Sequence, residues 1–228
     1  ADLIQEADYM LVYSAYEQGR PNAVELLKDY LDVYPASRHA DEVNFLIGSA
    51  HFGQGEYQKA IFWFNESNID MLSPEQQEAY CFRLAYSLLQ IGDMEKARGY
   101  FARIEQIGTK YREASTYYVA YIDYATGKYN NALVEFTRLK DLPDYKERSL
   151  YYITQIYFIQ NKYEKVISEG KELLASYPDS ENNSEVYRIM GNAYYHLGNE
   201  DQAINMLSKY VSSTDSPLRG DLYILGVC

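Results

Sequence analysis

The sequence predicts an all-α fold, a solenoid of antiparallel helix pairs. Three observations support this prediction: a repeat of 34 to 37 residues, a glycine or asparagine between two apolar-periodic runs in each repeat, and a fixed spacing of small and large residues. Repeats of this length are typical of architectures in which each unit buries its apolar face against its neighbours.

A small residue marks the start of the second run in every repeat, and these residues recur with spacings of 37, 37, 35, 34 and 37. They are Ala23, Ala60, Ala97, Ala132, Val166 and Ala203. Each follows a turn residue, in order Gly19, Gly55, Gly92, Gly127, Asn161 and Gly198. A glycine suits the left-handed backbone that ends a helix. We therefore expect each unit to contain a first helix, a turn and a second helix.

A second spacing predicts how the two helices of a unit meet. Four residues after the small residue comes a large apolar one in five of the repeats: Leu27, Phe64, Phe101, Phe136 and Leu207. Residues four apart share one helix face. Twelve residues before the small residue lies another small one in four repeats: Gly48, Ala85, Ala120 and Gly191. The facing small residues should let the two helices approach closely.

Six such units are expected between residues 1 and 216. Their ranges are about 4–37, 41–73, 78–109, 113–143, 147–178 and 184–215. Residues 217–228 are expected to form the first helix of a seventh unit that stops before its turn. Because an array normally ends in a polar capping repeat, we expect this chain to be a piece of a longer array.

Two Ser-Pro pairs are predicted to begin helices. At the first, Ser73 is the expected N-cap, Pro74 occupies the first turn and Gln76 is the capping partner. Ser216-Pro217 is expected to repeat this arrangement at the seventh unit.

In residue types and order, these units resemble the tetratricopeptide repeat (TPR) family over nearly the whole chain. The clearest copy runs from Phe45-Leu46-Ile47-Gly48 through Tyr57 and Ala60 to Phe64. The resemblance implies a right-handed superhelix whose first helices line a concave groove. It also implies that extended peptides or partner helices bind in this groove.

Two linkers carry a narrower resemblance, Tyr34-Pro35-Ala36-Ser37 and Tyr177-Pro178-Asp179-Ser180. They look like linkers of bacterial cell-envelope TPR proteins. This likeness implies a periplasmic or cell-envelope location, with the cytoplasm as the alternative.

Charge and hydropathy narrow the class of partner. The net charge of −12 argues against binding to nucleic acid and to anionic membrane surfaces. The longest uncharged stretch in the most apolar region, residues 149–161, is shorter than the roughly 20 residues that span a bilayer. We therefore expect a protein or peptide partner, no nucleic acid and no transmembrane segment in this chain.

No constellation typical of an enzyme is found in the sequence. The three histidines, His39, His51 and His196, have no metal-ligand spacing with one another or with the two cysteines. Phosphate-binding glycine loops and the Gly-x-Ser-x-Gly nucleophile motif are absent as well. The sequence predicts a protein without catalytic residues, cofactor or metal.

Aromatic residues are the unusual feature, with 26 tyrosines and 8 phenylalanines. Phasing from the small residues places one set of side chains on the groove side of the first helices. The predicted partner-binding residues are Phe45, Phe52, Phe82, Tyr86, Tyr117, Tyr121, Tyr124, Tyr151, Phe158, Asn192 and Tyr195. Tyrosine offers a broad apolar surface with a polar end, as recognition surfaces require. The alternative is that these rings only pack between adjacent repeats.

The leading functional hypothesis is a non-catalytic module that holds a peptide segment or helix in this aromatic groove. Its acidic charge would steer basic partners toward it. One alternative is a structural spacer or assembly surface in an envelope complex, with possible self-association. A further alternative is glycan binding, since flat tyrosine surfaces also stack on sugars.

Overall fold

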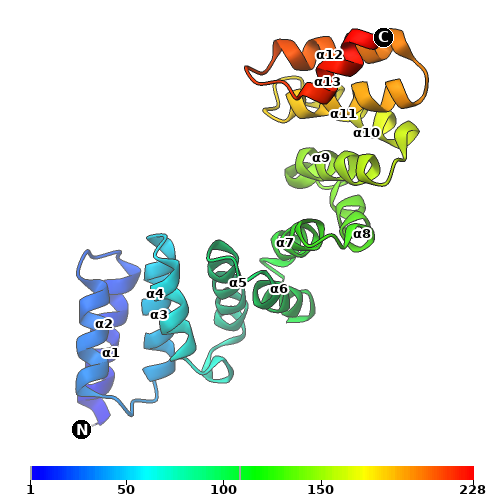
Figure 1. Ribbon diagram of the computed structural model, residues 1–228. Helices are drawn as coiled ribbons and strands as arrows, with labels where there is room; N and C mark the ends of the chain where they lie inside the picture. The colour runs from blue at the N-terminus through cyan, green and yellow to red at the C-terminus, as the bar shows by residue number, and fades with distance from the viewer. Residues whose placement is uncertain (1, 108) are drawn as a thin grey trace. The chain divides into compact units, whose positions relative to one another are not determined.

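The computed structural model describes residues 2–107 and 109–228, without the side chains of residues 105–107. Over these residues the chain forms thirteen α-helices and one short 3-10 helix, with no strand (Figure 1). The chain divides into two compact units, Ala1–Val119 and Ala120–Cys228.

Unit 1 contains three consecutive helix pairs and the beginning of α7. The bounds are α1 Asp2–Glu17, α2 Ala23–Val33, α3 Ala40–Gly53, α4 Tyr57–Asn65, η1 Ile69–Met71, α5 Pro74–Gln90, α6 Met94–Ile107 and α7 Arg112–Ala125. Each first helix packs on the second helix of its own pair, and each second helix contacts the first helix of the next pair where those contacts are described. Helix α3 also contacts α5, so first helices of successive pairs lie side by side.

Unit 2 continues the same order from the end of α7. The bounds are α8 Tyr129–Leu139, α9 Pro143–Ile159, α10 Tyr163–Ser176, α11 Asn183–His196, α12 Glu200–Ser212 and α13 Arg219–Val227. The first helices α9, α11 and α13 contact one another in sequence, as α3 and α5 do in unit 1. Helices α5 and α9 begin at Pro74 and Pro143, four residues before the expected repeat starts at 78 and 147.

The predicted left-handed turns are confirmed. Five glycines have positive φ, and Asn161, with a φ of 55°, is the one other residue of the described chain in that region. The residue after each turn donates its N–H to a carbonyl five positions back, for example Glu56 to His51 at 2.9 Å and Lys162 to Tyr157 at 2.8 Å. This is the Schellman hydrogen bond that closes a helix C-terminus.

The predicted spacing of small and large residues also places both kinds in the core. Ala60, Phe64, Ala97 and Phe101 are fully buried in unit 1, and Ala203 and Leu207 in unit 2. Gly170 stands where the other repeats carry the large residue. A Cβ atom at Gly170 would lie 2.5 Å from the Met190 sulfur, so Met190 of the next helix fills that space.

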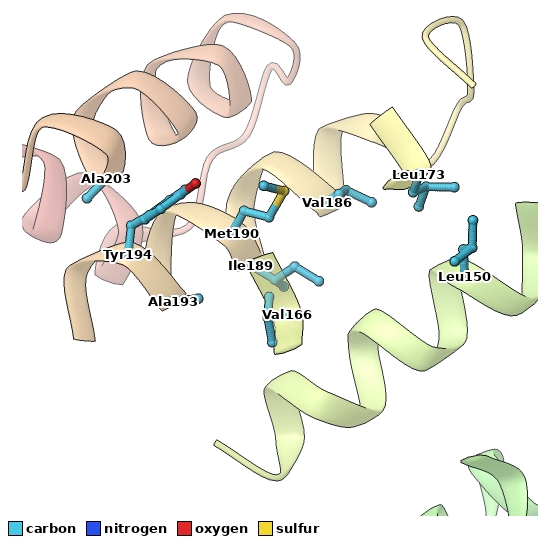
Figure 2. Packing of buried hydrophobic residues seen from close by; sticks show 9 residues of the cluster. All are labelled: Leu150, Val166, Leu173, Val186, Ile189, Met190, Ala193, Tyr194 and Ala203. Atoms are coloured by element: carbon cyan, nitrogen blue, oxygen red, sulfur yellow. The ribbon is translucent and has the colours of Figure 1, made fainter. Parts of the chain in front are cut away.

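Figure 2 shows the core of unit 2, where side chains from α9, α10, α11 and α12 converge. Leu150 and Leu173 meet at one end of this cluster, and Tyr194 and Ala203 lie at the other. Helix α11 supplies five of its nine residues and therefore lies at its centre.

One of the two predicted Ser-Pro caps is confirmed and the other is wrong. Ser73 caps α5 with a complete capping box. The Ser73 hydroxyl accepts from the Gln76 N–H, and the Gln76 side-chain oxygen accepts from the Ser73 N–H at 3.0 Å. At α13, the first helix of the seventh unit, the N-cap is Leu218, and its N–H donates to the Tyr210 hydroxyl at 3.1 Å. The tyrosine of the preceding helix thus binds the N–H of the N-cap residue, the group that Gln76 binds at α5.

Candidate partner-binding site

In unit 1, the predicted groove residues of α3 and α5 belong to a continuous set of ring contacts. Phe52 of α3 meets Tyr86 of α5 edge to face, with ring centroids 5.8 Å apart. Tyr57 contacts both rings, at 6.2 Å from Phe52 and 5.9 Å from Tyr86. All three rings are half-buried, so they connect neighbouring repeats and still leave part of their surface accessible.

A second set of rings surrounds Phe82 on α5. Phe82 stacks on Tyr111 at 4.5 Å and lies 5.7 Å from Phe101. Tyr118 stacks on Phe101 at 4.9 Å and contacts Tyr86 at 5.5 Å. The predicted residue Tyr117 is half-buried and meets Tyr118 edge to face at 5.4 Å.

Phe45 lies deeper than predicted. Only 4% of its surface is exposed, because it packs against Phe64 at 6.2 Å and lies beneath the Arg83 guanidinium at 5.6 Å. It forms part of the floor of a pocket of about 400 Å³ rather than an open contact surface. Side chains from α1, α3, α5 and the segment before α7 line this pocket.

In unit 2, Tyr152 lies at the centre of the predicted aromatic residues. It contacts Tyr124 at 5.0 Å, Tyr121 at 5.9 Å and Tyr151 at 5.3 Å, and it stacks on Phe136 at 4.9 Å. Burial is the main cause that raises the pKa values of Tyr124 and Tyr151, so both phenols stay protonated at neutral pH. The predicted residues are therefore brought together around a tyrosine that was not predicted.

Tyr118 and Tyr152 are the functional candidates that the sequence reasoning missed. They lie 34 residues apart, which is one repeat period, and each stacks on the second-helix phenylalanine of the preceding repeat. The repeat period could have revealed the pair, because Phe101 and Phe136 lie 35 residues apart, which is also one repeat period.

Toward the C-terminal end of unit 2, Phe158 and Tyr195 are half-buried against the core cluster. Phe158 lies 5.8 Å from the Arg188 guanidinium, and Tyr195 meets His196 edge to face at 5.8 Å. Phe158 lies on α9 and Tyr195 on α11, so the two rings come from neighbouring first helices.

The prediction that Asn192 faces a partner is corrected by the structure. Asn192 is 8% exposed, and its amide donates to Asp221 of α13 at 2.7 Å and to the Arg188 carbonyl at 2.9 Å. Arg188 pairs with Glu185 at 2.6 Å, and this bond holds the pKa of Arg188 above its ordinary value. Helix α13 thus binds the Asn192 side chain that was predicted to face a partner.

The comparisons with known proteins decide the family. Residues 9–69 match one family model described as tetratricopeptide repeat, and residues 78–106 and 185–213 match a second model with the same description. These segments cover just over half of the chain.

The chain belongs to the tetratricopeptide repeat family. As a member of this family it is a protein–protein interaction scaffold with an all-α TPR solenoid fold. No curated protein matches the sequence.

Solved TPR structures support the same fold. A TPR protein from Parabacteroides merdae ATCC 43184 is 17% identical with a TM-score of 0.62, over 97% of this chain and 84% of that chain. YrrB, described as a TPR protein with an unusual peptide-binding site, is 11% identical with a TM-score of 0.66, over 90% and 97%. MamA AMB-1 is 12% identical with a TM-score of 0.65, over 80% and 96%. At such identities, the likeness shows the fold alone.

Two further properties bear on what the TPR surfaces can do. Among the described residues, no three or more His, Cys, Asp or Glu side chains are grouped so that they could hold a metal ion. In that same part of the chain, no helix combines the length and the apolar character needed to cross a membrane. The chemistry available at the candidate surfaces is aromatic contact, hydrogen bonding from tyrosine and pairing with charged side chains.

Proposed function

We propose that this TPR protein binds an extended peptide segment or a helix of a partner protein across the aromatic side of its first helices. The observation that carries the proposal is the partial exposure of Phe52, Phe82 and Tyr86 in unit 1. Each ring is held by neighbouring rings, so little side-chain freedom is lost when a partner covers it. Peptide binding by YrrB, a protein of the same fold, supports the proposal.

The test is selection from a random dodecapeptide library, displayed at the N-terminus of a phage coat protein, on the immobilised full chain. Phe52→Leu and Tyr86→Leu keep an apolar side chain at each position and remove the rings. We expect peptides enriched on the parent to lose binding to this double variant. Phe62→Leu is the control, because Phe62 is 57% exposed on the second helix α4.

Circular dichroism and thermal unfolding establish that each variant keeps its helices. Equal peptide binding by the parent and the double variant would show that the peptide does not bind on the aromatic surface, and would overturn the proposal. Equal loss in the Phe62→Leu control would do the same, because the effect would then not belong to the first helices.

A second candidate function, an assembly surface, is favoured by the apolar side chains of α1. Leu3 and Leu11 are 86% and 68% exposed, and Met10 beside them is 57% exposed. This candidate predicts a molar mass that rises with concentration in light scattering and falls back in the Leu3→Asp, Leu11→Asp variant. A constant molar mass would exclude it. The cell-envelope location inferred from the two linkers stays a prediction.

A further inference from the structure

The pocket of about 400 Å³ in unit 1 combines an apolar floor with aromatic walls. Phe45 and Leu46 of α3 are buried beneath it, and Tyr13 and Tyr16 of α1 form one wall. Tyr111 closes the other side. Because three successive first helices contribute side chains, the pocket opens on the same side of unit 1 as the predicted binding residues.

Arg83 brings a positive charge into this pocket. Its guanidinium lies 5.6 Å from the centre of the Phe45 ring, and the side chain is half-buried. Within the described side chains, no carboxylate lies at ion-pair distance from it. A cation over an aromatic face at a partly desolvated site interacts more strongly with an incoming anion than a cation in bulk water does.

Tyr16 adds a hydrogen-bond donor near this cation. Burial raises the pKa of Tyr16, and the positive charge of Arg83 acts in the opposite direction. The phenol stays protonated at neutral pH and can donate to an oxygen that pairs with Arg83. Lys110, 5.5 Å above the Tyr111 ring, supplies a second and more exposed positive charge.

Two exposed carboxylates at the rim limit what can enter. Glu17 and Glu75 line the pocket but form no ion pair with Arg83 in the described structure. Together with the net charge of −12, they disfavour a segment that carries many acidic residues. A peptide segment with one carboxylate among apolar residues can pair with Arg83 and also pack against the apolar floor.

We propose that this pocket binds the side-chain carboxylate of a single Asp or Glu in an extended partner peptide, with Arg83 as its ion-pair partner. An apolar residue of the same peptide packs against Phe45 and Tyr111. The inference rests on the proposed function, because it assumes that a peptide lies on this side of unit 1, and it specifies the chemistry of that peptide.

The experiment begins with peptides selected from the N-terminally displayed dodecapeptide library. Display in this form leaves no free peptide C-terminus, so any selected carboxylate comes from a side chain. A selected peptide is synthesised with a C-terminal amide, together with its Glu→Gln or Asp→Asn derivative. Both are titrated by calorimetry against the parent protein and the Arg83→Gln variant. Arg103→Gln, on the exposed face of the second helix α6, is the matched control.

We expect the selected peptides to share one acidic position next to an apolar residue. Neutralising that position should weaken binding to the parent at least about tenfold, as for a charge-assisted hydrogen bond. The same peptide change should have no further effect on Arg83→Gln, and the control should behave as the parent. Arg83→Lys keeps the positive charge, so its binding should still weaken when the acidic position of the peptide is neutralised. This variant replaces Arg83→Gln in the comparison if Arg83→Gln unfolds.

Two results would overturn the inference and leave the proposed function intact: selected peptides without a shared acid, or an equal effect of the acid on parent and Arg83→Gln. Failure to select any peptide on the parent would overturn the proposed function and this inference together.

Discussion

The Phe64 ring lies directly on the backbone of Gly48, with no room between them for a side chain. A Cβ atom at Gly48 would be 2.8 Å from the ring atoms Cδ1 and Cε1 of Phe64. Gly191 and Leu207 repeat this arrangement in unit 2, where the corresponding distance is 2.6 Å. The small residue of the first helix and the large residue of the second helix of the same pair are therefore in direct contact, and the absence of a side chain on one makes room for the other.

This contact predicts that Gly48→Ala destabilises the protein. An added methyl group must displace a fully buried ring, and overpacking of this kind costs about 1–3 kcal/mol. The gain in helix propensity, about 1 kcal/mol, offsets only part of that cost. Urea unfolding monitored by circular dichroism measures the net change.

Gly53→Ala is the matched control for this prediction, because Gly53 ends the same helix and has no atom within 4 Å of its Cβ position. It should be neutral or slightly stabilising. Equal effects at the two glycines would show that the Gly48 contact relaxes without cost.

The turns give a second prediction, about backbone conformation alone. Gly127 has a φ of 78° and open space around its Cβ position. Gly127→Ala should therefore cost about 1–2 kcal/mol, the penalty of the left-handed region for an L-residue. Gly127→Asn should cost less, since asparagine tolerates this region, as Asn161 does at a φ of 55°.

The measurement is the midpoint of urea unfolding for both Gly127 variants and for Gly99→Ala, a control in mid-helix with open space around it. Equal stability of the Gly127→Ala and Gly127→Asn variants would contradict the explanation by backbone conformation.

The fold could be predicted from the sequence because its signals are local. A positive φ selects glycine or asparagine, and this pattern recurs in all six repeats. A close helix contact selects a small residue opposite a large one, and this second pattern is complete in four of them. Ser73 likewise carries its own cap, with Gln76 three residues away. Ser216 could not be judged in this way, because the group that binds at that helix start, Tyr210, lies on the preceding helix.

The candidate site could be predicted less well, because facing and burial depend on neighbouring repeats. The prediction placed Tyr117 and Tyr151 on the groove and missed Tyr118 and Tyr152, one position along each helix. A shift of one residue turns a side chain by about 100° on a helix, from the open side to the facing repeat. The role proposed for Arg83 depends on rings from three other segments, so its place on its own helix could not establish it.

Asn192 leads to a prediction about helix α13. Asp221 is 4% exposed, and Asn192 donates to its Oδ1, while Arg188 lies 3.8 Å from its Oδ2. Asn192→Ala removes the hydrogen bond to a buried carboxylate, which costs about 1–3 kcal/mol. Because α13 packs mainly on α11 and α12, the loss should appear as local opening of α13.

Limited trypsin digestion measures this opening, since Arg219 lies in the first turn of α13. Cleavage after Arg219 should be several-fold faster in Asn192→Ala than in the parent. Asn205→Ala, at an exposed position on α12, is the control and should not change the rate. An unchanged rate in Asn192→Ala would mean that the hydrogen bond does not hold α13.

Cys81 makes stability depend on pH in the alkaline range. Burial raises the pKa of its thiol from 9.0 to about 11, because the thiolate would lie in an apolar environment. In the unfolded chain, the thiol loses its proton near its ordinary pKa. Between pH 9 and 11 the unfolded state therefore binds fewer protons than the native state, and stability falls as the pH rises.

By pH 10, the contribution of Cys81 to the free energy of unfolding should be lower by about 1 kcal/mol than at pH 7.5. Cys81→Ala lacks this titration, whereas buried tyrosines such as Tyr80, with a pKa raised to about 12, titrate in both proteins. Urea unfolding at the two pH values should show a larger loss in the parent than in Cys81→Ala. An equal loss would place the Cys81 thiol in contact with water, against its complete burial.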